Sequence, residues 1–144
     1  VGSGNKSHLI QNWIDKNNPS NVKLINQLEN TEYSILESYC DVGMVFLDSR
    51  FTIPNFPSRI LSYMECKLPL LIATDKVSDL GPTAKNNEFG LWSESNDISH
   101  FNKNLYFYIN NSEDRKQMGI NAYNFLTKNY DVFRTYDTIM KHFK

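Results

Sequence analysis

Short apolar runs recur along the chain and alternate with longer segments in which apolar residues return every three or four positions. Such runs indicate strands that are covered on both faces, as in parallel sheets, and the longer pattern indicates amphipathic helices. The runs are Val22–Ile25, Val42–Leu47, Leu68–Ala73 and Phe89–Trp92. This alternation implies right-handed crossovers, and it predicts an α/β fold with a Rossmann-like parallel sheet and flanking helices.

The helical segments each carry an apolar face. These faces are formed by Leu9, Ile10, Trp13 and Ile14; by Tyr33, Leu36 and Tyr39; by Ile60, Leu61 and Met64; by Phe101, Leu105, Phe107 and Tyr108; and by Val132, Phe133, Tyr136, Ile139, Met140 and Phe143. Asp97 or Ser99 is the predicted start of the fourth of these helices, and Ser112 starts a further one. Gly119 lies inside the predicted helix that starts at Ser112 and lowers the stability of that helix, so we expect Gly119 to serve close packing.

A polar loop and a helix join the second and third runs, and the start of that helix carries candidate chemistry. Pro57 suits the first helical turn, because its fixed φ is helical and its missing N–H would be unpaired there. Asn55 or Phe56 is then the predicted cap. Free N–H groups, the Ser58 hydroxyl and the Arg59 guanidinium together predict a phosphate site. The alternative is an ordinary α/β connection with an arginine on its solvent face.

Composition and charge narrow the function classes. A length of 144 residues predicts a single domain, residues 1–144, and 40% hydrophobic residues are enough for a core. The 15 basic and 16 acidic residues give a net charge of −1, which argues against a general nucleic-acid binder. No apolar run approaches the roughly 20 residues that span a bilayer, and no signal peptide opens the chain, so we expect a cytoplasmic protein.

The sequence offers no metal site or disulfide framework. Cys40 and Cys66 lie far apart without a partner motif and are interpreted as reduced, packed thiols. The histidines His8, His100 and His142 are scattered without metal-ligand spacing.

The segment Gly2–Ser7 invites comparison with the phosphate-binding loop of P-loop proteins. That loop needs a glycine directly before its Lys-Ser pair, and Asn5 stands there instead. A plain strand-to-helix turn is therefore the preferred interpretation.

The segments Ile53–Met64 and Lys67–Asp75 resemble the donor-binding segment of GT-B glycosyltransferases. The resemblance is nearest to the nucleotide-sugar-dependent enzymes that build bacterial capsule and O-antigen polysaccharides. Further landmarks follow in the family's order and extend the resemblance over nearly the whole chain: Val1–Gly4, Asp41–Leu47, Asp79–Gly81, Phe89–Trp92 and Arg115–Gly119. No landmark is specific alone, but the ordered set is.

The resemblance implies the C-terminal, donor-binding half of a GT-B enzyme. The donor would be a UDP-sugar or a similar nucleotide sugar, and the acceptor a saccharide or a lipid-linked saccharide. The N-terminal GT-B domain would be a partner, with no nucleic acid, cofactor or metal involved. A place at the inner face of the plasma membrane, through peripheral association, is compatible with this function.

The same resemblance assigns candidate donor-binding residues. Ser58 and Arg59 would hold the diphosphate, and Ser62 would lie near the ribose. The loop after the apolar run Val42–Leu47 would line one side of the nucleotide site. The loop after Leu68–Ala73 would lie at the same edge of the sheet. The candidates in these two loops are Arg50, Asn55, Phe56, Asp79 and Leu80.

Several features depart from the family. The family's domain begins one strand and one helix earlier, so we expect an N-terminally clipped domain that is inactive alone. Many relatives carry paired glutamates, where Pro54 and Ser62 stand here, and a neutral Ser62 bonds a ribose more weakly than a carboxylate. No catalytic residue stands out, since Glu65 is interpreted as a solvent-facing charge. The alternative function is a non-catalytic doubly wound interaction or receiver-like module, but Asp41 and Asp75 do not follow the acidic pattern of a receiver.

Overall fold

The computed structural model describes residues 1–53 and 56–143 of the chain. These residues form two compact units, Val1–Leu36 and Glu37–Lys144, each with its own internal contacts.

The first unit holds the helix α1 (Ser7–Asn17) and most of α2 (Asn30–Ser38). The predicted strand at Val22–Ile25 is wrong, because this segment has no regular secondary structure. A strand is held by a ladder of backbone hydrogen bonds. Among the described residues, this segment makes one such bond, from Gly2 N to the Ile25 carbonyl at 3.0 Å. An apolar run alone does not reveal whether a neighbouring strand is present.

A three-stranded parallel sheet forms the centre of the second unit. Its strands are β1 (Gly43–Phe46), β2 (Leu70–Thr74) and β3 (Gly90–Glu94), in the order β1-β2-β3. Leu70 of β2 is in register with Gly43 on one side and with Gly90 on the other. All five side chains of β2 are buried, as the unbroken apolar run predicted. The prediction of a Rossmann-like parallel sheet with flanking helices is confirmed.

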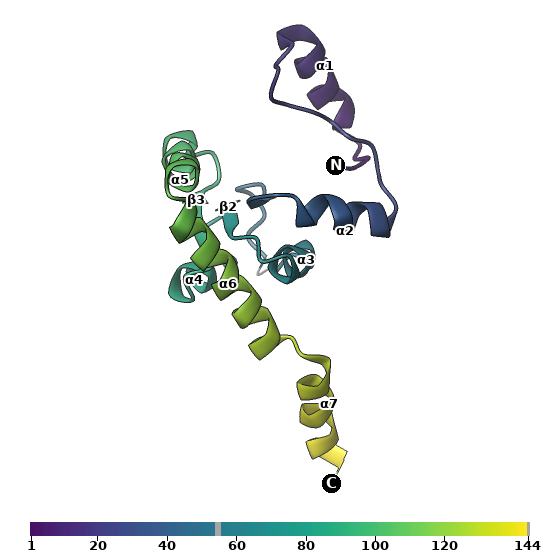
Figure 1. Cartoon of the computed structure of the whole chain (residues 1–144), viewed down its shortest axis with the longest axis vertical. Helices are drawn as coiled ribbons and strands as arrows, with labels where there is room; N and C mark the ends of the chain where they lie inside the picture. The colour runs from purple at the N-terminus through teal and green to yellow at the C-terminus, as the bar shows by residue number, and fades with distance from the viewer. Residues whose placement is uncertain (54–55, 144) are drawn as a thin grey trace. The chain divides into compact units, whose positions relative to one another are not determined.

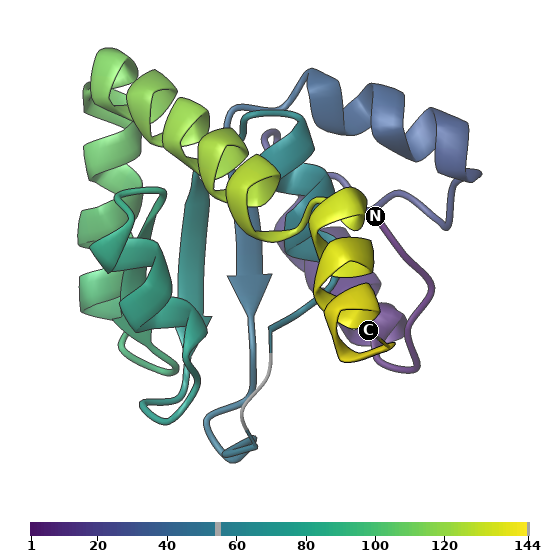
Figure 2. The same cartoon turned by 90° about the horizontal axis from the view of Figure 1, so that it is seen from below.

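Helices from the two crossovers, together with a later helix, cover one face of the sheet (Figures 1 and 2). The crossover helices α3 (Arg59–Glu65) and α4 (Leu80–Asn86) join consecutive strands, and α6 (Ser112–Asn129) packs against α3. Their shared core contains aliphatic, aromatic and alanine side chains from all of these elements: Val45, Ile60, Met64, Leu70, Ile72, Leu80, Ala84, Phe89 and Ala122.

The opposite face is covered by α5 (Ile98–Asn110). Asp97, one of the two predicted starts, caps this helix by accepting a hydrogen bond from His100 N at 2.9 Å. The Phe101 ring of α5 lies 5.3 Å from the Phe46 ring of β1. The buried Tyr108 hydroxyl donates to the Leu70 carbonyl at 3.0 Å, which ties α5 to the central strand.

The end of α3 meets α6 backbone to backbone. Lys67 adopts a left-handed φ of 55°, and its N–H bonds to the Met64 carbonyl while Leu68 N bonds to that of Tyr63, which is the Schellman arrangement. A Cβ on Gly119 would overlap the Lys67 carbonyl oxygen and lie 2.9 Å from the carbonyl carbon. The expectation that Gly119 serves close packing is therefore confirmed.

The last helix, α7 (Val132–Met140), continues into a 3-10 turn at Lys141–Phe143. Its predicted apolar face is present but exposed: Phe133 is 76% exposed and Phe143 is 78% exposed. Among the residues that the structure describes, no helix is both long enough and apolar enough to cross a membrane.

The contact at Gly119 gives a test of the fold. Gly119→Ala should lower the free energy of unfolding by about 1–3 kcal/mol, because the new methyl group is forced against the Lys67 backbone. This cost outweighs the gain of about 1 kcal/mol that alanine brings to a helix interior. Thermal unfolding followed by circular dichroism should show a Tm lower by several degrees.

Gly4→Ala is the matched control, because a Cβ there meets nothing within 4 Å. An unchanged or higher Tm for Gly119→Ala would show that α6 can move away at no cost.

Candidate functional site

The carboxyl ends of the three parallel strands lie at one edge of the sheet. This is where open α/β folds bind ligands. The loops that follow β1, β2 and β3 all begin here, and α3 and α4 start from two of them. Most of the predicted donor-binding residues belong to these loops and helix starts.

The start of α3 brings Ser58 and Arg59 together. Ser58 is the N-cap residue and Arg59 is the first helical residue, and both are exposed. The cap is thus later than the predicted Asn55 or Phe56. It falls later because the first turn is tight, with Ile60 N bonded to the Pro57 carbonyl at 3.1 Å. Asn55 lies outside the described residues.

Arg59 has no acidic partner among the described residues, whereas Arg50 does. The Arg50 guanidinium donates two hydrogen bonds to Asp48, from Nε to Oδ1 at 2.8 Å and from Nη2 to Oδ2 at 2.7 Å. This pairing holds the pKa of the Asp48 carboxyl well below its usual range. Arg50 is thus engaged within its own loop, and Arg59 is the guanidinium at this edge that is open to an anion.

The Ser62 hydroxyl is engaged by other groups of the second unit. It lies 2.9 Å from Glu37 Oε1 and 2.8 Å from the Arg59 carbonyl, so its hydrogen is already engaged. Glu37 is only 4% exposed. Spacing along the chain does not reveal this buried carboxylate, because its partner Ser62 lies on another helix.

Phe56 packs inward. Its ring stacks on Tyr130 with the centroids 5.7 Å apart and the planes at 17°, and it contacts the core of the second unit. Burial raises the pKa of the Tyr130 phenol. One face of the Phe56 ring is therefore occupied by the chain's own aromatic side chain.

Asp79 and Leu80 mark the start of α4. Asp79 is the exposed N-cap residue, and its side chain makes no capping hydrogen bond. Leu80 is fully buried in the core, so only its backbone could face a ligand at the edge.

Asp75 organises the loop between β2 and α4, a role that the sequence did not reveal. Its carboxylate accepts from Val77 N at 2.7 Å, from Ser78 N at 2.9 Å and from Ser78 Oγ at 2.6 Å. The Ser78 hydroxyl bond is the main reason that the pKa of Asp75 is lowered, and the two backbone bonds add to it. The loop is thereby fixed before it enters α4.

Two further contacts join the loops after β1 and β3. The Ser95 hydroxyl donates to the Leu47 carbonyl, and Asn96 Nδ2 donates to Ser49 Oγ at 3.0 Å. Beside these contacts lies a hollow of about 230 Å³, lined by side chains that include Phe46, Glu94 and Phe101. The edge is therefore a set of loops held together by hydrogen bonds, with a small hollow on the α5 side.

The described residues contain no group of three or more His, Cys, Asp or Glu side chains that could hold a metal ion. The arrangement at the edge instead offers a guanidinium, a hydroxyl and backbone groups, which are donors suited to an anion.

Comparison with known proteins gives a family match over most of the chain. The family described as Glycosyl transferases group 1 matches residues 1–125, which include the whole sheet and the starts of α3 and α4. An uncharacterised glycosyltransferase of Methanocaldococcus jannaschii is 29% identical over 128 residues, which are 89% of this chain and 35% of that protein. The chain thus spans about a third of the length of that relative.

Asp75 gives a pH test of the loop. Its folded pKa is lowered, so its stabilising contribution is complete above the unfolded value of about 3.9 and disappears as pH falls through the folded pKa. Asp75→Asn should therefore have a lower Tm than the wild type at pH 7. The difference should shrink below about pH 4, where the wild type also loses the charge.

Calorimetry between pH 2.5 and 7 would measure both profiles. Asp79→Asn is the control, because the Asp79 side chain makes no capping bond and its profile should follow the wild type. A difference between Asp75→Asn and the wild type that stays constant with pH would contradict the role of the charge.

Proposed function

Because this chain belongs to the family of glycosyl transferases group 1, we propose that the carboxyl edge of its sheet binds the diphosphate of a nucleotide-sugar donor. The observation that carries the proposal is the exposed pair at the start of α3. Arg59 has no acidic partner among the described residues, and the Ser58 hydroxyl makes no capping bond.

The chemistry of glycosyl transfer explains why these groups would serve. The donor's diphosphate leaves with its electron pair, and negative charge builds up on it in the transition state. A guanidinium can hold two phosphate oxygens at once through its fork of N–H donors. Groups positioned in advance around the leaving diphosphate lower the barrier without reorganising during the reaction.

The other candidates take secondary roles in this proposal. Asn55 and Asp79 would border the nucleotide from the two loops of the edge. Arg50 would act only by exchanging Asp48 for a phosphate, and Ser62 only by turning away from Glu37. We therefore place the diphosphate contact on Ser58 and Arg59 before any ribose contact.

The finer substrate assignments follow the resemblance of the donor segment. We propose a UDP-sugar as donor and a surface polysaccharide or its lipid-linked precursor as acceptor. Transfer would need an N-terminal GT-B domain to present the acceptor. It would take place in the cytoplasm, with peripheral membrane association when the acceptor is lipid-linked.

The test is titration of UDP into the wild-type chain and its variants by isothermal titration calorimetry. Arg59→Ala should weaken binding by roughly ten- to a hundredfold, since a charge-assisted hydrogen bond contributes about 1.5–3 kcal/mol. Arg59→Lys should recover part of the loss, because lysine keeps the charge but lacks the fork.

Two controls sharpen this test. Arg134→Ala removes an exposed guanidinium from α7 and should leave UDP affinity unchanged. Uridine has no phosphate, so Arg59→Ala should not alter its affinity. Equal UDP affinities for the wild type and both Arg59 variants would reduce Arg59 to a surface charge and overturn the proposal.

A further inference from the structure

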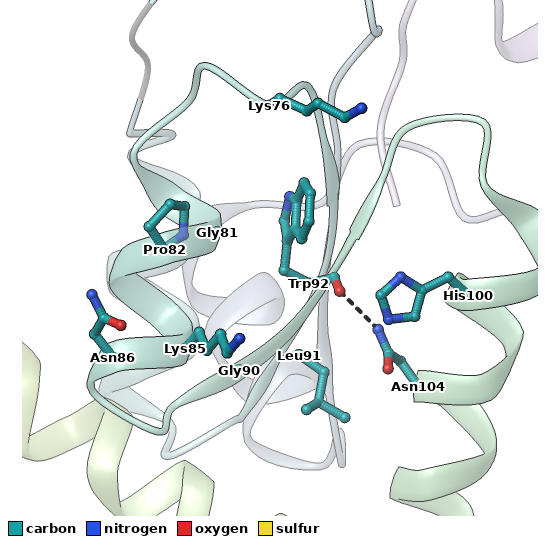
Figure 3. A pocket seen from close by; sticks show the side chains of 10 residues that line it. All are labelled: Lys76, Gly81, Pro82, Lys85, Asn86, Gly90, Leu91, Trp92, His100 and Asn104. Carbon is teal, nitrogen blue, oxygen red and sulfur yellow. Dashed lines mark hydrogen bonds between the residues drawn. The ribbon is translucent and has the colours of Figure 1, made fainter.

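A groove of about 510 Å³ runs along the outer side of β3, between α4 and α5 (Figure 3). Its volume is within the range of small-molecule sites, about 300–1,000 Å³. β2 separates this groove from β1 and the loop that leads to Ser58 and Arg59. It is therefore distinct from the proposed diphosphate site.

The aromatic wall of the groove is Trp92, and its ring is held in place. The indole N–H donates to the buried Thr74 hydroxyl at 2.9 Å. The ring packs closely against Gly81 of α4, where a Cβ would lie 2.5 Å from Trp92 Cδ1. The ring is thus fixed before any ligand arrives, which lowers the entropic cost of binding against it.

The backbone edge of β3 supplies hydrogen-bonding groups. Phe89 and Ser95 bond toward β2, so by alternation Gly90 and Trp92 point their backbone groups outward. The buried Asn104 side chain donates to the Trp92 carbonyl at 3.0 Å (Figure 3). This amide occupies the acceptor that an added strand would need, so the edge does not favour strand pairing.

The charge of the groove is positive. Its lining includes Lys76 and Lys85 and contains no aspartate or glutamate. Lys76 is already paired with Glu94, Nζ to Oε2 at 3.0 Å. Lys85 has no acidic partner among the described residues, and it reaches from α4 into the groove (Figure 3).

We propose that this groove binds an acidic hexose, a pyranose that carries a carboxylate. The flat apolar face of the sugar would lie against Trp92, and its hydroxyls would bond Asn104 and the outward backbone groups of β3. The carboxylate would pair with Lys85. A locked aromatic ring, a few convergent polar groups and an unopposed cation are what such a ligand requires.

The experiment is an NMR titration of the ¹⁵N-labelled chain with D-glucuronate, D-glucose and inorganic phosphate. Glucuronate should shift the signals of the Trp92 backbone and indole N–H and of the Asn104 side-chain amide. Glucose and phosphate should bind at least tenfold more weakly. Lys85→Glu should weaken glucuronate binding by about tenfold or more, since it replaces the cation with a negative charge that repels the ligand's carboxylate.

Matched controls separate this site from the diphosphate site. Lys103→Glu reverses an exposed charge on α5 that does not line the groove, and it should leave glucuronate binding unchanged. Arg59→Ala should also leave it unchanged, and Lys85→Glu should leave UDP binding unchanged. Equal affinity for phosphate, equal affinity for glucose, or no shifts at the groove would each overturn the proposal, whatever the result with UDP.

Discussion

The burial of β2 on both faces is the constraint on which the second unit depends. Five consecutive buried side chains, Leu70 to Thr74, need cover above and below, and every backbone group between them needs a partner. The parallel neighbours β1 and β3 supply the partners, and helices on both faces supply the cover. Parallel pairing in turn requires crossovers, so that α3 and α4 both start at the carboxyl edge of the sheet. The proposed diphosphate site would therefore owe its position to the burial of one strand, because Arg59 stands where the topology places the start of α3.

The two proposed sites differ in how rigidly they are built. The groove beside β3 is fixed by contacts inside the core layer: Trp92 is held by Thr74, and Asn104 by the Trp92 carbonyl. At the sheet edge, Asp75 fixes one loop through three hydrogen bonds, while Ser58 and Arg59 stand exposed at the start of a short helix. A site of the first kind recognises the shape of a ligand, and one of the second kind recognises mainly its charge.

Local signals in the sequence predicted the elements that depend on local physics. The apolar run at Leu68–Ala73 became β2, Asp97 capped its helix, and Gly119 proved to be a point of close packing. The strand expected at Val22–Ile25 failed because a strand also depends on a neighbour, which no periodicity shows. The hydrogen bonds between Ser62 and Glu37, and between Trp92 and Thr74, cannot be predicted from the sequence pattern for the same reason. Residues that meet only after folding, on different elements, leave no mark in the spacing of a single chain.

The contact between Gly119 and the Lys67 carbonyl has a consequence for synthesis on the ribosome. The two residues are about fifty positions apart, and α6 also supplies Ala122 to the core. At translation rates of about 5–20 residues per second, the end of α3 would wait roughly 3–10 seconds for its partner to be made. Until then, the apolar face that α6 covers is open on the nascent chain. During this interval the open face is a surface at which the nascent chain can aggregate or be bound by chaperones.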